Sequence, residues 1–171
     1  KMLAISESLF VEQGYRFVPY ELIYHHPGVI DLLNPEKVKE LGKGIDNWSS
    51  TDIFAHYIVG PAWKQQIIPD SLIEEWLLSS SVWWRRAALV STIYLYGDVG
   101  RMLEYSEVLI DNKEDLIIKA ISWVLREATK YDPRAVKDFL SQHEDRLAAR
   151  IKREVSNKLV TGLKNPTKNL S

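Results

Sequence analysis

The feature that most constrains the fold is a series of helix-forming segments, each marked by its own start and stop residues. Asn34-Pro35 is an N-cap followed by proline at the first helical position, and Gly42 ends that segment. Asp132-Pro133 begins a later segment in the same way. Between these points apolar residues recur at helical spacing, and no convincing alternating strand interrupts them. The sequence therefore predicts an all-α chain.

The spacing of the segments indicates a repeat architecture. We expect helices over roughly 35–42, 49–59, 70–78, 82–96, 99–110, 114–130, 133–142 and 144–163. Short connectors favour antiparallel helix pairs. Trp48, Trp84 and Trp123 recur after 36 and 39 residues, just below the period of about 40–47 residues in HEAT and armadillo repeats. We predict a single HEAT-like α-solenoid domain over 1–171, an α–α superhelix whose concave face suits a long partner.

Composition excludes several classes of protein. At 46% hydrophobic residues the chain can bury a core, and with no cysteine it has neither disulfides, a thiolate zinc site nor a cysteine nucleophile. No window approaches 18 apolar residues and no basic-then-apolar leader opens the sequence, so we expect a cytoplasmic protein without membrane contact. The four histidines lack metal-ligand spacing, and we expect no metal and no cofactor.

Two groups of residues in the first half combine aromatic and charged side chains. Trp48 stands four residues before Asp52, and His56 follows four residues later on the same helical face, where it could orient the carboxylate. Ser49 with Asp52 resembles a capping box, and Gly60-Pro61 is expected to break this helix. Capping and core packing would explain the first group without any function.

The second group is Trp83-Trp84-Arg85-Arg86 at a helix start. Arginine makes planar, bidentate contacts with phosphate or carboxylate, so this group suits an anionic ligand. A surface arginine pair over a buried indole is the alternative.

The second half adds a third indole and a basic face. Trp123 lies beside, not within, the apolar stripe of its predicted helix, and Lys119 precedes it by one turn. In the last helix Arg146, Arg150 and Arg153 fall within a sector of about 60° beside the apolar stripe. Clustered arginines with few acids between them are typical of phosphate-backbone contacts, although a solvated face is the commoner explanation.

The order of these motifs resembles one family. In chain order the motifs are Trp48 and Asp52, then Trp84-Arg85-Arg86-Ala87-Ala88, then the run from Lys119 to Glu127, then Lys152-Arg153-Glu154. This order is similar to that of the DNA alkylation repair family of HEAT-like DNA glycosylases, the AlkD-like proteins. The resemblance covers roughly residues 45–160. Family members ordinarily have further helices before the Trp…Asp segment, so we expect part of the N-terminal arm to be absent here.

The resemblance implies an activity and a site. It implies hydrolysis of the N-glycosidic bond of cationic alkylated purines, such as 3-methyladenine and 7-methylguanine, in double-stranded DNA held on the concave face. Trp48, Asp52 and Trp123 fall on the family's catalytic cleft positions, and Arg86 falls on its phosphate-binding position. Asp52 would stabilise the oxocarbenium and orient water, while the two indoles contact the lesion. The remaining DNA-binding candidates are Arg85, Lys119, Arg146, Arg150 and Arg153.

Three hypotheses follow from these residues. The first is a monomeric, metal-free alkylpurine DNA glycosylase. The second is a non-catalytic HEAT-like module that binds DNA or a protein, and the third is a hydrolase that uses Asp52 and His56 on another substrate.

The charge distribution bears on the first two hypotheses. The net charge of −1 averages two unlike halves, because residues 1–80 carry 6 basic and 11 acidic side chains whereas residues 81–171 carry 16 and 12. Near-neutrality therefore does not exclude DNA, but it predicts modest, salt-sensitive binding.

Overall fold

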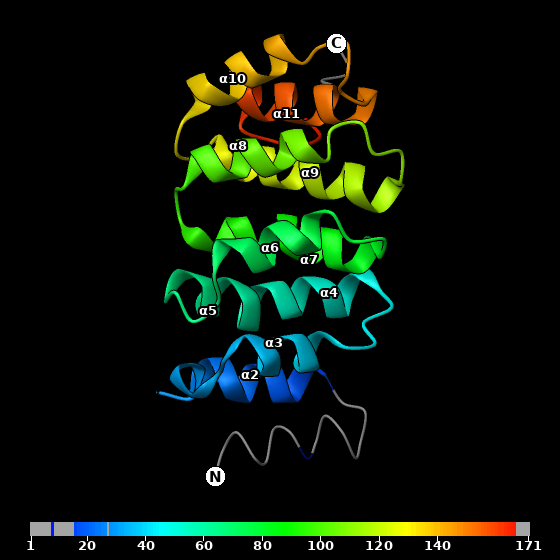
Figure 1. The fold of residues 1–171 in the computed structure, drawn as a ribbon. Helices are drawn as coiled ribbons and strands as arrows, with labels where there is room; N and C mark the ends of the chain where they lie inside the picture. The colour runs from blue at the N-terminus through cyan, green and yellow to red at the C-terminus, as the bar shows by residue number, and fades with distance from the viewer. Residues whose placement is uncertain (1–7, 9–15, 27, 167–171) are drawn as a thin grey trace. The chain divides into compact units, whose positions relative to one another are not determined.

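The computed structural model describes residue 8, residues 16–26 and residues 28–166, and its elements are shown in Figure 1. These residues form helices and connecting turns with no strand, which confirms the all-α prediction. The chain divides into two compact units, Lys1–Leu95 and Tyr96–Ser171. The expectation of one domain over 1–171 stays a prediction.

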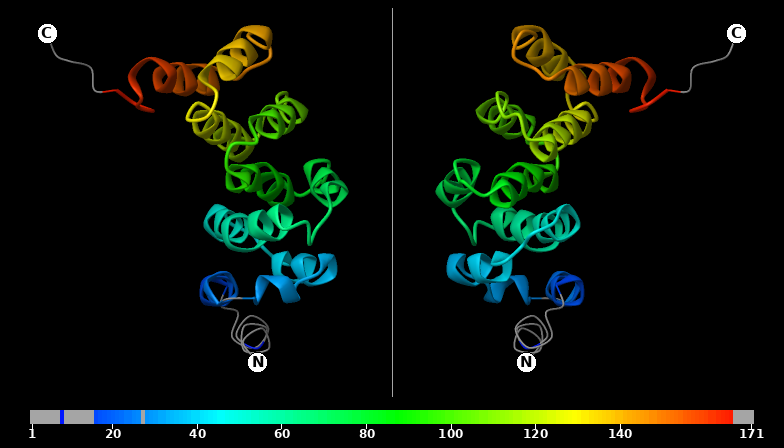
Figure 2. Two further views of the ribbon diagram at one scale, coloured as in Figure 1. Left: turned by 90° about the vertical axis from the view of Figure 1, so that its left-hand side faces the viewer. Right: turned by 90° about the vertical axis from the view of Figure 1, so that its right-hand side faces the viewer.

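The first unit contains six α-helices and three shorter helical turns among its described residues. In chain order they are α2 (Phe17–His25), η1 (Ile30–Leu32), α3 (Pro35–Gly42), α4 (Trp48–Phe54), η2 (Ala55–Val59), α5 (Gly60–Lys64), α6 (Asp70–Leu77), α7 (Val82–Ser91) and η3 (Thr92–Leu95). Helix α6 packs on α7, its neighbour across a short turn, and α4 packs on α7. The helices of each unit appear in pairs in the side views of Figure 2, as in a helical-repeat protein.

The second unit contains four helices among its described residues. They are α8 (Val99–Val108), α9 (Asp115–Ala128), α10 (Pro133–Gln142) and α11 (Ala149–Thr161). Helix α9 packs on both α8 and α11, and its apolar stripe is buried as predicted. That stripe consists of Ala120, Ile121, Val124, Leu125 and Ala128.

Several helix starts confirm the capping signals in the sequence. The Asn34 side chain accepts a hydrogen bond from the backbone N–H of Lys37 at 2.8 Å, and Asp132 accepts one from Ala135 at 2.9 Å. Each cap satisfies one N–H group that the first helical turn leaves without a partner. Helices α3 and α10 therefore begin where the sequence places them.

Three predicted boundaries are wrong. Asn47, not Ser49, caps α4, because the Asn47 carboxamide accepts the Ser50 N–H at 2.9 Å. Gly60-Pro61 does not break the helix, which continues through the π-helical turn η2 into α5. Proline has no N–H to donate, and the wider turn closes with the Gly60 N–H bonded to the Ala55 carbonyl. The last helix begins at Ala149, so Arg146 lies in the preceding turn, off the face predicted for it.

Aromatic rings form much of the core of the first unit. Trp84 packs on Trp76 with ring centroids 4.5 Å apart and on Phe54 at 6.0 Å, and Phe54 also contacts Tyr20. Gly42 makes room for this cluster, because a Cβ there would clash with the Trp84 indole.

None of the helices in the described part of the chain has the length and apolarity that crossing a membrane requires.

Candidate functional site

Asp52 and Arg86 form a two-bonded ion pair that joins α4 to α7. The Arg86 Nε donates to Asp52 Oδ1 at 2.8 Å, and its Nη2 donates to Oδ2, also at 2.8 Å. The side chains are 16% and 7% exposed for Asp52 and Arg86, respectively. Parallel bonds of this kind fix the orientation of both planar groups. The ion pair therefore holds the carboxylate in one direction while leaving part of it open to solvent.

Two contacts indicate that the helical runs carrying these residues extend in the same direction. Asp52 pairs with Arg86. His56, which follows Asp52 by one turn, stacks on Tyr94, which follows Arg86 by two turns. Helix α6 lies between α4 and α7 in sequence and reverses the chain, so that α7 returns parallel to α4. Residues 34 positions apart thus meet across a helix–helix contact.

Asp52 keeps unused acceptor capacity. Within the described residues Arg86 is its one side-chain partner. An ionised carboxylate offers about four lone-pair sites, and the two Arg86 bonds occupy two of them. The remaining sites can accept a hydrogen bond from a water or a ligand. His56 does not bond to Asp52, so the predicted orienting role of His56 toward this carboxylate is wrong.

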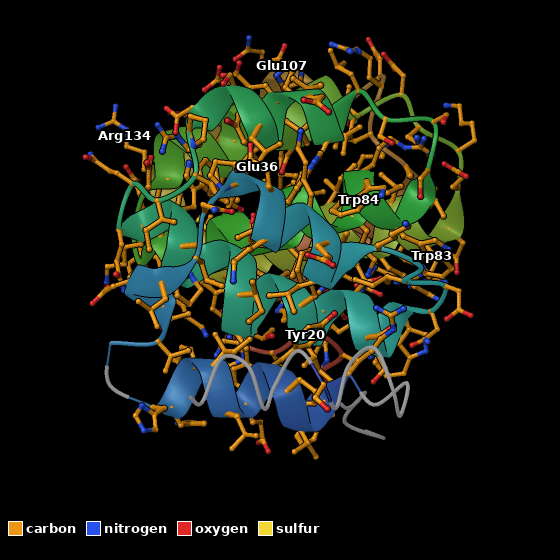
Figure 3. All side chains as sticks on the ribbon, turned by 60° about the horizontal axis from the view of Figure 1, so that its bottom comes forward. Tyr20, Glu36, Trp83, Trp84, Glu107 and Arg134 are labelled. Carbon is orange, nitrogen blue, oxygen red and sulfur yellow. The ribbon has the colours of Figure 1, made fainter. Side chains whose placement is uncertain are left out.

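The six tryptophans separate into two sets of three. Trp76 and Trp84 are packed against other rings, and the Trp63 indole donates to Asp70 Oδ1 at 2.7 Å. In the described part of the chain the other three make neither a hydrogen bond nor a ring contact, and they are Trp48, Trp83 and Trp123. Figure 3 marks Trp83 and Trp84, neighbours in sequence that fall into different sets. Indoles usually find partners when they are buried, so the second set suits external ligands.

Trp48 is the most exposed feature of the first-unit site. It is the first residue of α4, one turn before Asp52 on the same helical face, and it is 61% exposed. Trp83 stands one turn before Arg86 on α7 and is partly exposed. Two indoles therefore precede the two members of the ion pair on their respective helices.

Trp123 lies in the second unit beside a buried polar network. It is partly exposed on α9, next to the buried Ser122. The Ser122 hydroxyl donates to Glu154 Oε2 at 2.7 Å, and Arg126 Nη1 donates to the same oxygen at 2.8 Å. Burial opposes the charge of Glu154, but the Ser122 bond and the charges of Lys164 and Arg126 outweigh it and hold its pKa below the usual value.

The predicted DNA-binding cations all have intramolecular partners. Arg85 donates to the carbonyls of Ser79 and Ser80 at 2.6 and 2.9 Å, in the turn before α7. In the second unit each cation has an acidic partner. Asp115 lies 2.6 Å from Lys119 and 3.3 Å from Arg150. Asp111 lies 2.7 Å from Arg146, and Glu154 lies 3.8 Å from Arg153. Exposed ion pairs of this kind are weak, so a phosphate can replace the acid. Their contact with DNA stays a prediction.

One comparison decides the family. Residues 28–159 match the family model described as "DNA alkylation repair enzyme". The chain belongs to this family. The match spans Trp48, Asp52, Arg86 and Trp123, and it reaches further toward the N-terminus than the motifs alone indicate. A search of curated proteins gave no match.

Two features of this family member were not anticipated from its sequence. One is the π-helical turn η2, which begins three residues after Asp52. The other is the stacking of His56 on Tyr94, with ring centroids 4.3 Å apart and planes inclined by 9°. The Gly60-Pro61 pair inside an apolar run was the available signal, since proline within a helix requires a local change in hydrogen bonding.

In the described residues no three acidic or histidine side chains gather in a way that would hold a metal ion.

Proposed function

We propose that the chain is a DNA glycosylase that hydrolyses the N-glycosidic bond of cationic alkylated purines in duplex DNA, with 3-methyladenine and 7-methylguanine as substrates. The observation that carries this proposal is the Asp52–Arg86 pair, a carboxylate held rigidly yet with unused acceptor sites, one turn from an exposed indole without a partner. Membership of the DNA alkylation repair family supports the choice of DNA as substrate.

The reaction does not require a strong general acid from the protein. An alkylated purine carries a positive charge, so when the bond from sugar C1′ to purine N9 breaks, its electron pair neutralises the departing base. The sugar is left as an oxocarbenium ion. A negative carboxylate close to that ion stabilises the transition state, and Asp52 is placed to act in this way. Water then adds to C1′ and loses a proton to solvent or to Asp52, which completes hydrolysis without a metal or cofactor.

The other residues position the substrate. Trp48 is exposed and Trp123 is partly exposed, and a cation–π contact between an indole and the lesion contributes about 0.5–2 kcal/mol. Arg86 fixes Asp52 through the two bonds described above. The phosphate contact expected of Arg86 remains a prediction, and it would involve a guanidinium that already holds a carboxylate. We further propose that the protein acts as a cytoplasmic monomer.

Release of 7-methylguanine from methylated duplex DNA tests this proposal. We expect the parent protein to release the base and Asp52→Asn to release it roughly 100- to 1000-fold more slowly, the usual cost of removing one electrostatic stabiliser. Glu74→Gln is the matched control, because Glu74 is an exposed carboxylate on α6 outside the site. Failure of the parent to release any base would contradict the proposal.

A non-catalytic DNA-binding module is the second candidate. The exposed pairs of Lys119 and Arg150 with Asp115, and of Arg146 with Asp111, are compatible with it, because a phosphate can replace the acid in each pair whether or not a base is released. Salt-dependent binding to DNA without base release would support this function instead.

A further inference from the structure

Five aromatic or histidine rings gather beside Asp52 in the first unit. They come from three elements: Tyr24 and His25 from α2, His56 and Tyr57 from η2, and Tyr94 from η3. Tyr24 lies 5.0 Å from Tyr57 and 5.6 Å from His56 between ring centroids. Four of the five rings are partly exposed and His25 is exposed, so the cluster lies at the surface of the unit.

His56 is clamped between two of these rings. Tyr94 stacks on it at 4.3 Å, and Tyr57 stacks on it at 4.5 Å with planes inclined by 23°. One face of an imidazole has room for one stacked ring, so the two tyrosines cover opposite faces. The residue is nevertheless partly exposed, and the edge of its ring, which no stacked ring covers, carries the two nitrogens.

The nitrogens of this edge are not used by the protein. Within the described residues the His56 side chain makes no hydrogen bond and no ion pair. Burial lowers the pKa of His56 below its usual value of 6.5, and the neighbouring His25 lowers it further. At neutral pH the ring is therefore uncharged, with one N–H donor and one acceptor nitrogen. A half-buried donor held rigidly without a partner is costly unless a ligand or water completes it.

The location of His56 links it to the Asp52 site. Trp48, Asp52 and His56 follow each other at four-residue intervals in one helical run, which places them along one face. At a rise of about 1.5 Å per residue the row is about 12 Å long. One strand of B-DNA advances about 3.4 Å per nucleotide, so the row matches three to four nucleotides.

We propose that His56 is a DNA-positioning residue, whose clamped imidazole edge donates a hydrogen bond to a phosphate oxygen of the lesion-bearing strand, next to the nucleotide that Asp52 faces. The proposal rests on the proposed function for its ligand, because it takes DNA to lie along the Trp48–Asp52–His56 row. Tyr57 and Tyr94 act through His56 by fixing the plane of its ring.

A phosphate fits this edge better than a base does. Both faces of the imidazole are covered, so His56 has no surface on which a base can stack. About half to two-thirds of protein–DNA hydrogen bonds go to the phosphate and sugar, and they set the register of the protein without reading sequence. A neutral donor also supplies this contact without adding to the counterion release that makes binding depend on salt.

Two substitutions of His56 separate this role from a purely structural one. His56→Phe keeps a ring between the tyrosines but removes the N–H, whereas His56→Gln keeps an N–H donor but loses the stack. Binding is measured by fluorescence anisotropy on two undamaged duplexes of different sequence, between about 50 and 200 mM salt. Thermal unfolding of each variant shows that it is folded.

We expect His56→Phe to bind both duplexes roughly tenfold more weakly than the parent, with an unchanged slope of log K against log salt. His56→Gln should bind within about threefold of the parent, although it unfolds at a lower temperature. The opposite order, with the Phe variant binding like the parent and the Gln variant weakened, would overturn the proposal and identify the stack as structural. If the slope of log K against log salt decreased by about 0.9 in His56→Phe, the lost contact would be that of a charged group, and the proposed contact of a neutral imidazole would be overturned.

Base release by the parent separates this inference from the proposed function. If the parent binds DNA but releases no 7-methylguanine, the glycosylase proposal fails, while the order of the two variants still decides the role of His56. If the parent releases the base and the Phe variant binds normally, the His56 contact alone is overturned. Absence of any DNA binding by the parent overturns both.

Discussion

Each unit joins two neighbouring helices through an arginine–carboxylate pair, yet the two carboxylates have very different surroundings. Asp52 has Arg86 as its one side-chain partner within the described residues. Glu154 accepts from Ser122 and Arg126 and also has Lys164 at 3.5 Å and Arg153 at 3.8 Å. The side chains are similarly buried, at 16% exposed for Asp52 and 7% for Glu154. Burial therefore does not distinguish the two carboxylates, whereas the number of partners does.

The difference suggests how to separate a structural carboxylate from a functional one in this fold. In Glu154 one oxygen, Oε2, accepts from Ser122 and Arg126 and lies 3.5 Å from Lys164, so this oxygen has little left to offer a ligand, and the charge serves the contact between α9 and α11. A carboxylate held by one arginine is fixed in direction but can still interact with a developing positive charge.

The largest effect on stability is expected at Glu154. Glu154→Ala leaves the largely buried Arg126 without its carboxylate, and removing one member of a buried pair costs about 3–5 kcal/mol. Urea denaturation measures this loss as a lower midpoint. Glu144→Ala is the control, because Glu144 is exposed in the turn before α11 and should change stability by less than about 0.5 kcal/mol. A loss below 1 kcal/mol at Glu154 would show that the network is not structural, contrary to the estimate from buried pairs.

A smaller effect is expected at Gly60, which supports the first-unit site. A Cβ at Gly60 would lie 2.5 Å from the Tyr94 Cβ and 3.2 Å from the Ala55 carbonyl oxygen, so η3 would have to move away from the start of α5. We expect Gly60→Ala to lower the free energy of unfolding by about 1–3 kcal/mol, as overpacking does. Gly100→Ala in α8 is the matched control, since its nearest neighbour would be an Asp98 oxygen at 3.8 Å. Equal unfolding midpoints for the two variants would contradict the close packing of α5 against η3.

Acid should remove the contribution of Glu154 selectively. Its pKa is lowered in the folded protein, so the stabilisation is complete above the unfolded value of 4.5 and is lost as the pH falls through the lower folded value. The difference in unfolding free energy between the parent and Glu154→Gln should therefore be full near about pH 7 and should shrink below about pH 4.5. Asp111 and Asp115 also have lowered pKa values, but they are present in both proteins. A difference that stays constant with pH would rule out this ionic role.

The smallest effect on stability is expected at Arg146. Its bond to Asp111 lies at the surface, with side chains 44% and 66% exposed, and such solvent-screened pairs contribute little to stability. If Arg146 contacts a DNA phosphate, Arg146→Ala should reduce the slope of log K against log salt by about 0.9 without unfolding the protein. An unchanged slope, measured by anisotropy, would remove Arg146 from the DNA-binding surface.

The sequence was sufficient for the helical class and for most helix positions, because these depend on local signals. Asn34 and Asp132 cap helices through their own side chains, and the stripe of α9 is read directly from its spacing. The π-helical turn was missed because Gly60-Pro61 is an ordinary helix-breaking pair when it is considered alone. Only the packing of Tyr94 against Gly60 and of α4 against α7 favours a continuous helix there.

The site was predicted residue by residue but not as an arrangement. Family resemblance pointed to Asp52 and Arg86 separately, as a catalytic carboxylate and a phosphate-binding arginine. Their bonding across 34 positions depends on the parallel packing of α4 and α7, which no local pattern encodes. Likewise, Trp83 and Trp84 are adjacent in sequence, yet only the structure shows that Trp84 has ring partners.

The most direct test of the contrast between the two carboxylates compares Asp52→Asn with Glu154→Gln in one pair of assays, 7-methylguanine release per folded molecule and urea unfolding. We predict that Asp52→Asn slows release per folded molecule at least about 100-fold, whereas Glu154→Gln retains release by the folded protein. Both variants should unfold at lower urea, because each weakens the pairing of a largely buried arginine. Release by Asp52→Asn at the rate of the parent would contradict the central claim that Asp52 is the catalytic carboxylate.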